Sequence, residues 1–201
     1  MSRPEQVIYL PGIRGEAAFW EPVAARLTGV APADILRYPW ASGSGPIVEA
    51  SSFEDLAGAV AARIDKPTAL VAQSLGGIVA VLAAAQRTEL VTHLVLVATS
   101  GGVRTDDLDV IDWQTPFLEA YPQVPRWVGT PLDLATQIAT LTMPVLLLWG
   151  GADPISPLSI GERLLSLLPS ARLEVMPAGE HDLAIRHADS VAEVIADHLR
   201  T

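Results

Sequence analysis

A chain of 201 residues, half of them hydrophobic and only 18% charged, can bury the core of one domain, which argues against intrinsic disorder. The net charge of −10 and the pI near 4.7 argue against a basic groove for nucleic acid and against docking to anionic lipids. The absence of cysteine excludes disulfides, thiolate metal sites and cysteine nucleophiles. We find neither a signal-peptide pattern nor an apolar run of membrane-spanning length, so we expect a cytoplasmic protein without a membrane partner.

Short apolar runs alternate with helical stretches along most of the chain. Strands are expected at residues 7–10, 35–38, 68–72, 93–98, 145–149 and 172–176. Helices are expected at residues 16–27, 53–64, 75–86, 157–168 and 188–199, and a loop at 41–46. Continuously apolar strands separated by helices are typical of a parallel sheet that is covered on both faces. The sequence therefore predicts a single α/β domain over residues 1–201, with a doubly wound, mostly parallel six-stranded sheet.

Residues 101–141 break the alternation between the fourth and fifth predicted strands. An interruption of about 40 residues is too long for a plain loop, so we expect a small, partly helical cap over the C-terminal edge of the sheet. Three of its aromatic residues, Trp113, Phe117 and Trp127, are candidates for the walls of a substrate pocket. The alternative is that they form a small core within the cap itself.

Ser74 lies between the third predicted strand and the following helix. A strand, a sharp turn and a helix strain the residue at the bend and project its side chain outward. The helix N-terminus also offers unpaired N–H groups to a developing anion. Such a bend needs small neighbours, and Ala72, Gly76 and Gly77 meet this condition. Ser74 is therefore a candidate nucleophile, the alternative being that it only caps the helix.

A serine hydroxyl needs a base to take its proton, and His181 is the best placed of the four histidines. It lies just past the sixth predicted strand, and Asp153 directly follows the fifth, so both reach the sheet edge where Ser74 lies. Asp153 is also a natural turn residue before proline. Glu180, His181 and Asp182 are adjacent and lack ligand partners at useful spacing, so we expect no metal. The spacing of residues 11–15 fits no phosphate cradle or dinucleotide loop, and no cofactor is expected.

The order Ser74, Asp153, His181, each after a separate strand, resembles the catalytic triad of the α/β-hydrolase superfamily. The resemblance covers residues 10–199. It implies a serine hydrolase that cleaves carboxylic esters of small or short-chain acyl groups through an acyl-enzyme. It also implies an oxyanion hole formed by the backbone N–H groups of Ile13 and Leu75.

Two positions depart from the pattern of that superfamily. The nucleophile turn usually reads Gly-x-Ser-x-Gly, and Ala72 replaces the first glycine here. The first strand usually ends in His-Gly, and Pro11-Gly12 stands there instead. Alanine is small enough for the turn, and the N–H groups of Ile13 and Leu75 do not depend on the side chain at position 11, so we expect the turn and the oxyanion hole to survive.

Other functions on the same fold remain open. A thioesterase or a cofactor-free perhydrolase would use the same triad, and a binding protein would keep the pocket without the chemistry. The expected substrate is a small-molecule ester. The chain is also similar to carboxylesterases that cleave methyl esters of acyl chains on larger partners, so an acyl-carrier partner stays open. Such a partner calls for a basic patch, for which Arg14, Arg104 and Arg126 are the candidates. The sequence does not indicate an oligomeric state.

Overall fold

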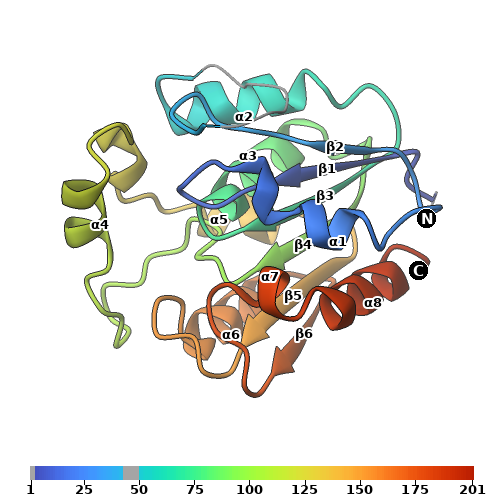
Figure 1. Ribbon diagram of the computed structural model, residues 1–201. Coiled ribbons are helices and arrows are strands. Elements are labelled where there is room, and N and C mark those ends of the chain that lie inside the picture. Colours follow the sequence, from blue (N-terminus) through green and yellow to red (C-terminus); the bar gives the residue numbers. More distant parts are fainter. Residues whose placement is uncertain (1–2, 43–49) are drawn as a thin grey trace.

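The computed structural model describes residues 3–42 and 50–201, which form one sheet of six strands flanked by helices (Figure 1). The strand order is β2-β1-β3-β4-β5-β6, and every neighbouring pair is parallel. The strands are β1 (Gln6–Leu10), β2 (Ala33–Ile35), β3 (Thr68–Gln73), β4 (Val91–Val97), β5 (Val145–Gly150) and β6 (Ala171–Met176). The predicted α/β architecture is therefore confirmed, with an entirely parallel sheet.

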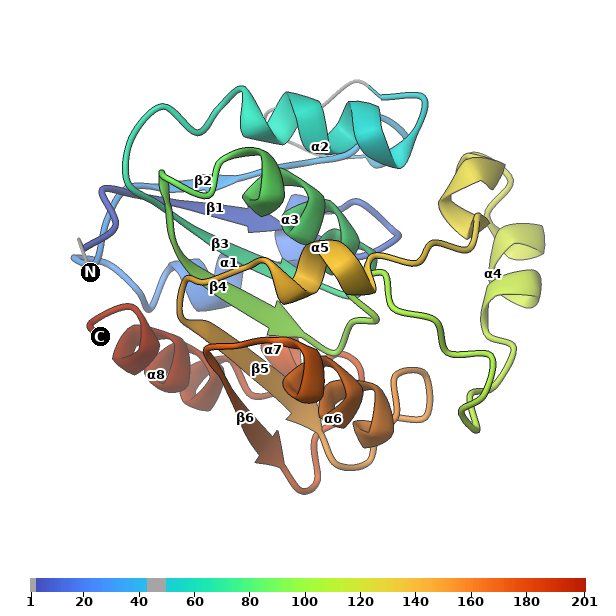
Figure 2. The same cartoon turned by 180° about the vertical axis from the view of Figure 1, so that it is seen from behind.

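Helices cover both faces of this sheet. The α-helices are α1 (Glu21–Ala24), α2 (Phe53–Ala61), α3 (Leu75–Gln86), α4 (Gln114–Ala120), α5 (Ala135–Ala139), α6 (Leu158–Leu167), α7 (Leu183–Arg186) and α8 (Ala188–His198). Two 3₁₀ helices are η1 (Ala17–Phe19) and η2 (Arg126–Gly129). Helices α1, α7 and α8 pack on the face in front in Figure 1, and α2, α3, α5 and α6 on the face in front in Figure 2.

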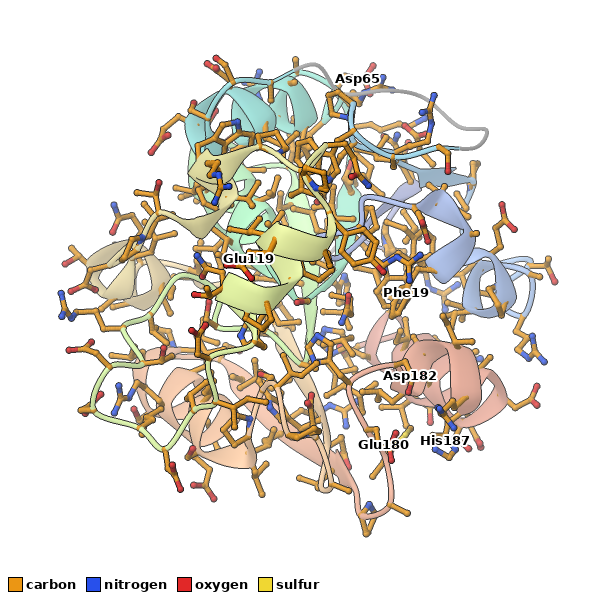
Figure 3. All side chains as sticks on the ribbon, turned by 60° about the vertical axis from the view of Figure 1, so that its left-hand side comes forward. Phe19, Asp65, Glu119, Glu180, Asp182 and His187 are labelled. Carbon is orange, nitrogen blue, oxygen red and sulfur yellow. The ribbon has the colours of Figure 1, made fainter. Side chains whose placement is uncertain are left out.

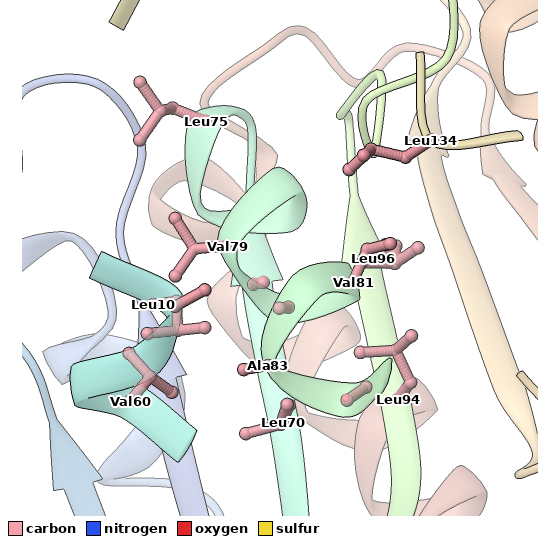
Figure 4. Packing of buried hydrophobic residues seen from close by; sticks show 14 of the residues in the cluster. Leu10, Val60, Leu70, Leu75, Val79, Val81, Ala83, Leu94, Leu96 and Leu134 are labelled. Atoms are coloured by element: carbon pink, nitrogen blue, oxygen red, sulfur yellow. The ribbon is translucent and has the colours of Figure 1, made fainter. Parts of the chain in front are cut away.

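The two faces hold two separate hydrophobic cores. Successive strand side chains point to opposite faces, so Leu70 joins the core under α2 and α3, and Val71 joins the core under α1 and α8. Both residues are fully buried, which explains why the strands are apolar without alternation. Figure 4 shows the first core, where helix α3 packs on the sheet close to Leu70, Leu94 and Leu96, with Val60 of α2 beside it.

Five of the six expected strands lie within two residues of the observed ones, but the expected helix at 16–27 is wrong. It is replaced by η1 and the four-residue helix α1. Pro22 explains the difference, because it has no N–H to donate and therefore stands in the first turn of a helix, not in its interior. The helix expected at 53–64 ends earlier, at Ala61. The short helix α7 was not expected.

The second strand also differs from the expectation of 35–38. The ladder covers residues 33–35, and the apolar residues after it, Leu36 and Tyr38, are fully buried beyond the end of the strand. Leu36 and Tyr38 are hydrophobic because they pack into the core, and not because they belong to a strand. Of the loop expected at 41–46, residues 43–46 lie outside the residues that the structure describes.

Residues 101–141 divide into two parts. Helix α5 packs against α3 and α6, and Ile138 and Leu141 are fully buried in the main core. Helix α4 stands away from the sheet, beyond the end of α3 and α5, as both ribbon views show. Residues 101–141 thus comprise an outer part, which overhangs the C-terminal ends of the strands, and a return segment, which belongs to the body of the domain. Within the described residues, no helix is long and apolar enough to cross a membrane.

Candidate active site

Ser74 forms the whole turn between β3, which ends at Gln73, and α3, which begins at Leu75. Its backbone angles, φ 52° and ψ −123°, lie in a region that residues with a side chain rarely adopt. The Ser74 side chain makes no capping hydrogen bond to α3, so the interpretation of Ser74 as a plain helix cap is wrong. The hydroxyl is carried on a strained turn and lines two cavities.

The turn is possible because the backbone of the β1 loop lies directly against it. A Cβ atom on Gly76 would lie 2.5 Å from the Pro11 carbonyl oxygen and 2.6 Å from that of Leu10. Contacts this short do not occur in proteins, so the close approach requires glycine at this position. Ala72 is fully buried and fits at the position where the superfamily usually has glycine.

Thr99, two residues beyond the end of β4, holds the same turn in place through hydrogen bonds. Its hydroxyl donates a hydrogen bond to the Ser74 carbonyl oxygen at 2.5 Å and accepts one from the Gly101 N–H at 2.9 Å. The Gly77 N–H donates to the same Ser74 oxygen at 2.9 Å. The sequence reasoning missed Thr99, although its place just after a strand at the same sheet edge was a usable signal.

His181 and Asp153 form a hydrogen-bonded pair, with 2.8 Å between His181 Nδ1 and Asp153 Oδ2. The Asp153 side chain has no exposed surface, whereas that of His181 is 22% exposed. Asp153 Oδ1 accepts two further hydrogen bonds, from the N–H groups of Ile155 at 2.8 Å and Ser156 at 3.0 Å. The carboxylate is therefore held on both oxygens, and the imidazole can present its other nitrogen, Nε2, to the cavities that it lines.

Pro157, and not Ser156, occupies the N-cap position of α6. Ser156 instead belongs to the loop that holds Asp153. Its N–H donates to the carboxylate, and its carbonyl oxygen accepts the indole N–H of the buried Trp149 at 2.9 Å. These two hydrogen bonds connect the loop to Asp153 and to Trp149, near the C-terminal end of β5.

The loops that carry Asp153 and His181 pack backbone against backbone. A Cβ atom on Gly150 would lie 2.3 Å from the Gly179 carbonyl oxygen, which also accepts a hydrogen bond from the Ala152 N–H at 2.9 Å. The Gly151 N–H donates to the Met176 carbonyl oxygen at 2.8 Å. These contacts fix the position of the acid relative to the base.

Ile13 and Leu75, the residues expected to form the oxyanion hole, line different cavities, and Ser74 lines both of these cavities. Leu75 is the first residue of α3, where the helix leaves its N–H groups without an intrahelical partner. In the part of the chain that the structure describes, neither the Ile13 nor the Leu75 N–H donates a hydrogen bond. Two side chains hold the Ile13 loop: the Trp40 indole donates to the Ile13 carbonyl oxygen at 2.8 Å, and the Tyr38 hydroxyl to that of Pro11 at 3.0 Å. Burial raises the pKa of Tyr38, so its hydroxyl remains a donor.

Two cavities meet at Ser74 and His181, and Trp113 and Ile155 also line both of them. The first has a volume of about 370 Å³ and extends under residues 102–132. The second has a volume of about 420 Å³ and extends between the β1 loop, η1 and α7. Figure 3 labels two of its lining residues, Phe19 and Asp182, in a view from the cap side. Volumes of this size are typical of small-molecule sites.

The three candidate pocket aromatics have different surroundings. Trp113 lines both cavities and Phe117 lines the second. Trp127 packs edge-on against Trp40 and Phe53, with ring centroids 5.7 and 5.2 Å apart, and lies outside the walls of these two cavities. Ile155, two residues after Asp153, lines both cavities, and no pattern in the sequence indicated it.

Two of the three candidate arginines for a basic patch are ion-paired. Arg14 pairs with Glu16 at 3.2 Å, and Arg104 makes two hydrogen bonds to Asp106, at 2.8 and 2.9 Å. Arg126 is exposed in η2. Among the residues that the structure describes, no three His, Asp or Glu side chains are grouped so that they could hold a metal ion.

Known proteins are similar to this chain in sequence and in fold. The chain is 28% identical over 239 aligned positions to a pimeloyl-[acyl-carrier protein] methyl ester esterase of Neisseria meningitidis serogroup A, and the match covers 96% of this chain and 76% of the relative. Among solved structures, a thermophilic esterase from Thermogutta terrifontis superposes with a TM-score of 0.79 at 16% identity, covering 100% of this chain and 91% of the other. The chain is an esterase-like α/β-hydrolase.

Further comparisons agree with this assignment. The mouse serine hydrolase BPHL is 27% identical over 161 positions, covering 67% of this α/β-hydrolase and 55% of the relative. No family model matches the chain. The Neisseria alignment needs more positions than this α/β-hydrolase has residues, so the relative carries insertions that are absent here.

Proposed function

We propose that this α/β-hydrolase cleaves carboxylic esters of small or short-chain acyl groups, with Ser74 as nucleophile, His181 as base and Asp153 as the orienting acid. The observation that carries the proposal is the buried Asp153–His181 hydrogen bond at the cavity that Ser74 lines from its strained turn. A fully buried carboxylate paired with a partly exposed imidazole is the arrangement that general-base catalysis needs.

The reaction follows from these positions. His181 Nε2 takes the proton of the Ser74 hydroxyl as Ser74 Oγ attacks the ester carbonyl. Asp153 holds the Nδ1–H tautomer and stabilises the imidazolium. The backbone N–H groups of Ile13 and Leu75 hold the oxyanion. His181 then donates the proton to the leaving alcohol, and a water molecule activated by His181 releases the acyl group from Ser74.

The first experiment combines a fluorophosphonate probe with p-nitrophenyl acetate, applied to the wild type and to Ser74→Ala. We expect the probe to label Ser74 in the wild type alone, and turnover to fall by roughly 10³-fold or more in the variant. Ser74→Ala that hydrolyses the ester at the normal rate contradicts the assignment. A panel of esters, thioesters and peracid-forming substrates then separates an esterase from a thioesterase or a perhydrolase.

An ester on an acyl-carrier protein is the second candidate substrate, because the Neisseria relatives are named for that reaction. Arg126 is the exposed cation of η2 that could meet an acidic carrier, whereas Arg14 and Arg104 are already paired with acids. The test compares a free methyl ester with the same acyl ester on a carrier protein. Under this proposal Arg126→Glu lowers kcat/KM for the carrier-bound ester and leaves kcat/KM for the free ester unchanged. If the wild type and Arg126→Glu have the same kcat/KM for the carrier-bound ester, the proposal is contradicted.

A further inference from the structure

We propose that the second cavity, between the β1 loop, η1 and α7, binds the hydrocarbon part of the substrate. The preferred ester then has an apolar chain on one side of the carbonyl and a small or polar group on the other. This inference rests on the proposed function, because it places the reacting carbonyl at Ser74, where the two cavities meet.

The walls of the second cavity are largely apolar. Hydrophobic side chains reach it from four separate segments: Ile13 from the β1 loop, Phe19 from η1, Phe117 from α4 and Ile185 from α7. Ile185 is 49% exposed and Phe19 is partly exposed, so a bound chain would cover apolar surface that water now contacts. Burial of such surface is the main source of affinity for a hydrocarbon.

The charged residues at this cavity are paired with one another or with neighbours. Arg14 and Glu16 form an ion pair at 3.2 Å, and Asp182 pairs with Arg186 at 2.8 Å. His181 faces the cavity while hydrogen-bonded to Asp153. A neutral chain therefore displaces water from this cavity without separating any of these charges.

The first cavity has a different chemistry. Apolar side chains such as Ile78, Val110 and Leu132 line it together with polar ones, namely Arg104, Thr105, Asp106, Gln114 and Thr130. Arg104 is bonded to Asp106 and Gln114 to the Gly129 carbonyl oxygen, but a hydrocarbon would remove water from the hydroxyl groups of Thr105 and Thr130 without replacing its hydrogen bonds, which costs free energy. The first cavity is therefore suited to the small or polar side of the ester.

The inference predicts how rate depends on chain length. Each methylene that enters an apolar cavity should raise kcat/KM about three- to fourfold until the cavity is full. Two series of substrates decide which side of the ester carries the chain: p-nitrophenyl acetate, butyrate, hexanoate and octanoate extend the acyl side, and methyl, butyl and hexyl acetate extend the alcohol side. A rise in either series supports the inference, and a flat response in both overturns it.

Two variants then test which cavity binds the hydrocarbon chain of the substrate. Ala18→Trp would fill the second cavity, which Ala18 lines from an exposed position, and we expect it to abolish the rise with chain length. Val110→Trp would fill the first cavity in the same way, and we expect the rise to persist. The reverse pattern overturns the inference.

Exposed residues provide a milder pair of variants. Ile185→Asp places a charge at the second cavity and should reduce the gain per methylene to less than twofold. Leu165→Asp makes the same change at an exposed leucine of α6, outside both cavities, and should behave as wild type. Thermal unfolding verifies that each variant is folded. If Ala18→Trp and Ile185→Asp are labelled by the fluorophosphonate probe but keep the wild-type response to chain length, this inference alone is refuted, whereas a wild type that is not labelled refutes the proposed function.

Discussion

Ser74 occupies a backbone conformation that costs on the order of 1–3 kcal/mol for a residue with a side chain. The surrounding residues offset this cost through hydrogen bonds to its main chain. The Ser74 N–H donates to the Val97 carbonyl oxygen at 3.0 Å, and its own carbonyl oxygen accepts from Thr99 and from Gly77. The position of the hydroxyl thus depends on groups that never touch a substrate.

Thr99→Val tests this support, because valine has the shape of threonine but lacks its hydroxyl. We expect kcat to fall about tenfold or more while KM changes little, since the Ser74 turn loses a buried hydrogen bond. Steady-state kinetics with p-nitrophenyl acetate measure the effect. Thr99→Ser restores the hydroxyl and should recover most of kcat; if both variants lose activity equally, Thr99 acts through packing and not through its hydrogen bond.

Asp153→Asn is a second residue-scale test. The amide keeps the shape of the carboxylate, but it removes the charge that holds the His181 tautomer, so we expect kcat to fall by about 10³- to 10⁴-fold. Asp197→Asn, an exposed acid at the end of α8, is the control and should keep full activity. Retention of kcat in Asp153→Asn would show that His181 acts without an orienting acid.

The positions of Ser74, Asp153 and His181 could be predicted because each lies within five residues after the end of a strand, and parallel strands bring their C-terminal ends to one edge. Contacts between loops could not be predicted in this way. Ile155 lines both cavities only because of how its loop folds around the Asp153 carboxylate. No periodicity or spacing carries that information.

At the scale of elements, the close packing of α3 on the β1 loop depends on Gly76. Gly76→Ala would push the carbonyl groups of Leu10 and Pro11 away, and with them the Ile13 N–H. We expect a loss of both stability and kcat. Gly58→Ala is the matched control, because a Cβ on Gly58 in α2 meets nothing within 4 Å and alanine favours a helix by about 1 kcal/mol.

Urea unfolding and kinetics measure both glycine variants. Gly58→Ala should unfold at a higher urea concentration than the wild type with unchanged activity, and Gly76→Ala at a lower one with reduced activity. If Gly76→Ala retains wild-type stability and turnover, the β1 loop is free to move and does not support the turn.

Helices and strands with a simple hydrophobic pattern could be predicted from the sequence. Those whose ends depend on a single proline or on a tertiary contact could not. Helix α3 has the predicted bounds, residues 75–86, and eight of its twelve residues are buried. The segment at 16–27 has helical periodicity, but Pro22 and the packing of Trp20 under the sheet break it into two short turns. The indole N–H of Trp20 donates a hydrogen bond to the Leu10 carbonyl oxygen at 2.9 Å, and this tertiary contact cannot be read from the local sequence pattern.

At the scale of the whole molecule, two buried histidines connect stability to pH. His93 of β4 and His198 of α8 are 1% and 2% exposed, and their rings meet edge-on at 5.3 Å. Burial, together with His93 and Arg172, lowers the pKa of His198 to about 4, and burial also lowers the pKa of His93. Both rings are therefore neutral in the folded protein near pH 7.

Because these pKa values are lower in the folded state than in the unfolded chain, stability is fully present above pH 6.5 and is lost as pH falls toward 4. His198 alone should lower the free energy of unfolding by about 2 kcal/mol between pH 8 and pH 5. Urea unfolding at both pH values measures this change. His198→Leu should remove most of it and His187→Gln should not; an equal loss in all three proteins would assign it to other groups.

The outer cap, the part of the chain between Gly102 and Leu134, is closed at its base by a hydrogen bond from the Leu134 N–H to the Gly102 carbonyl oxygen at 2.9 Å. Its two ends are therefore anchored side by side, whatever lies between them. Doubling the length of such a segment adds only about 0.6 kcal/mol to the cost of closing it. Evolution or an engineer can thus exchange the cap for a longer or shorter one without refolding the body of the domain, so substrate range can change while the catalytic residues stay in place.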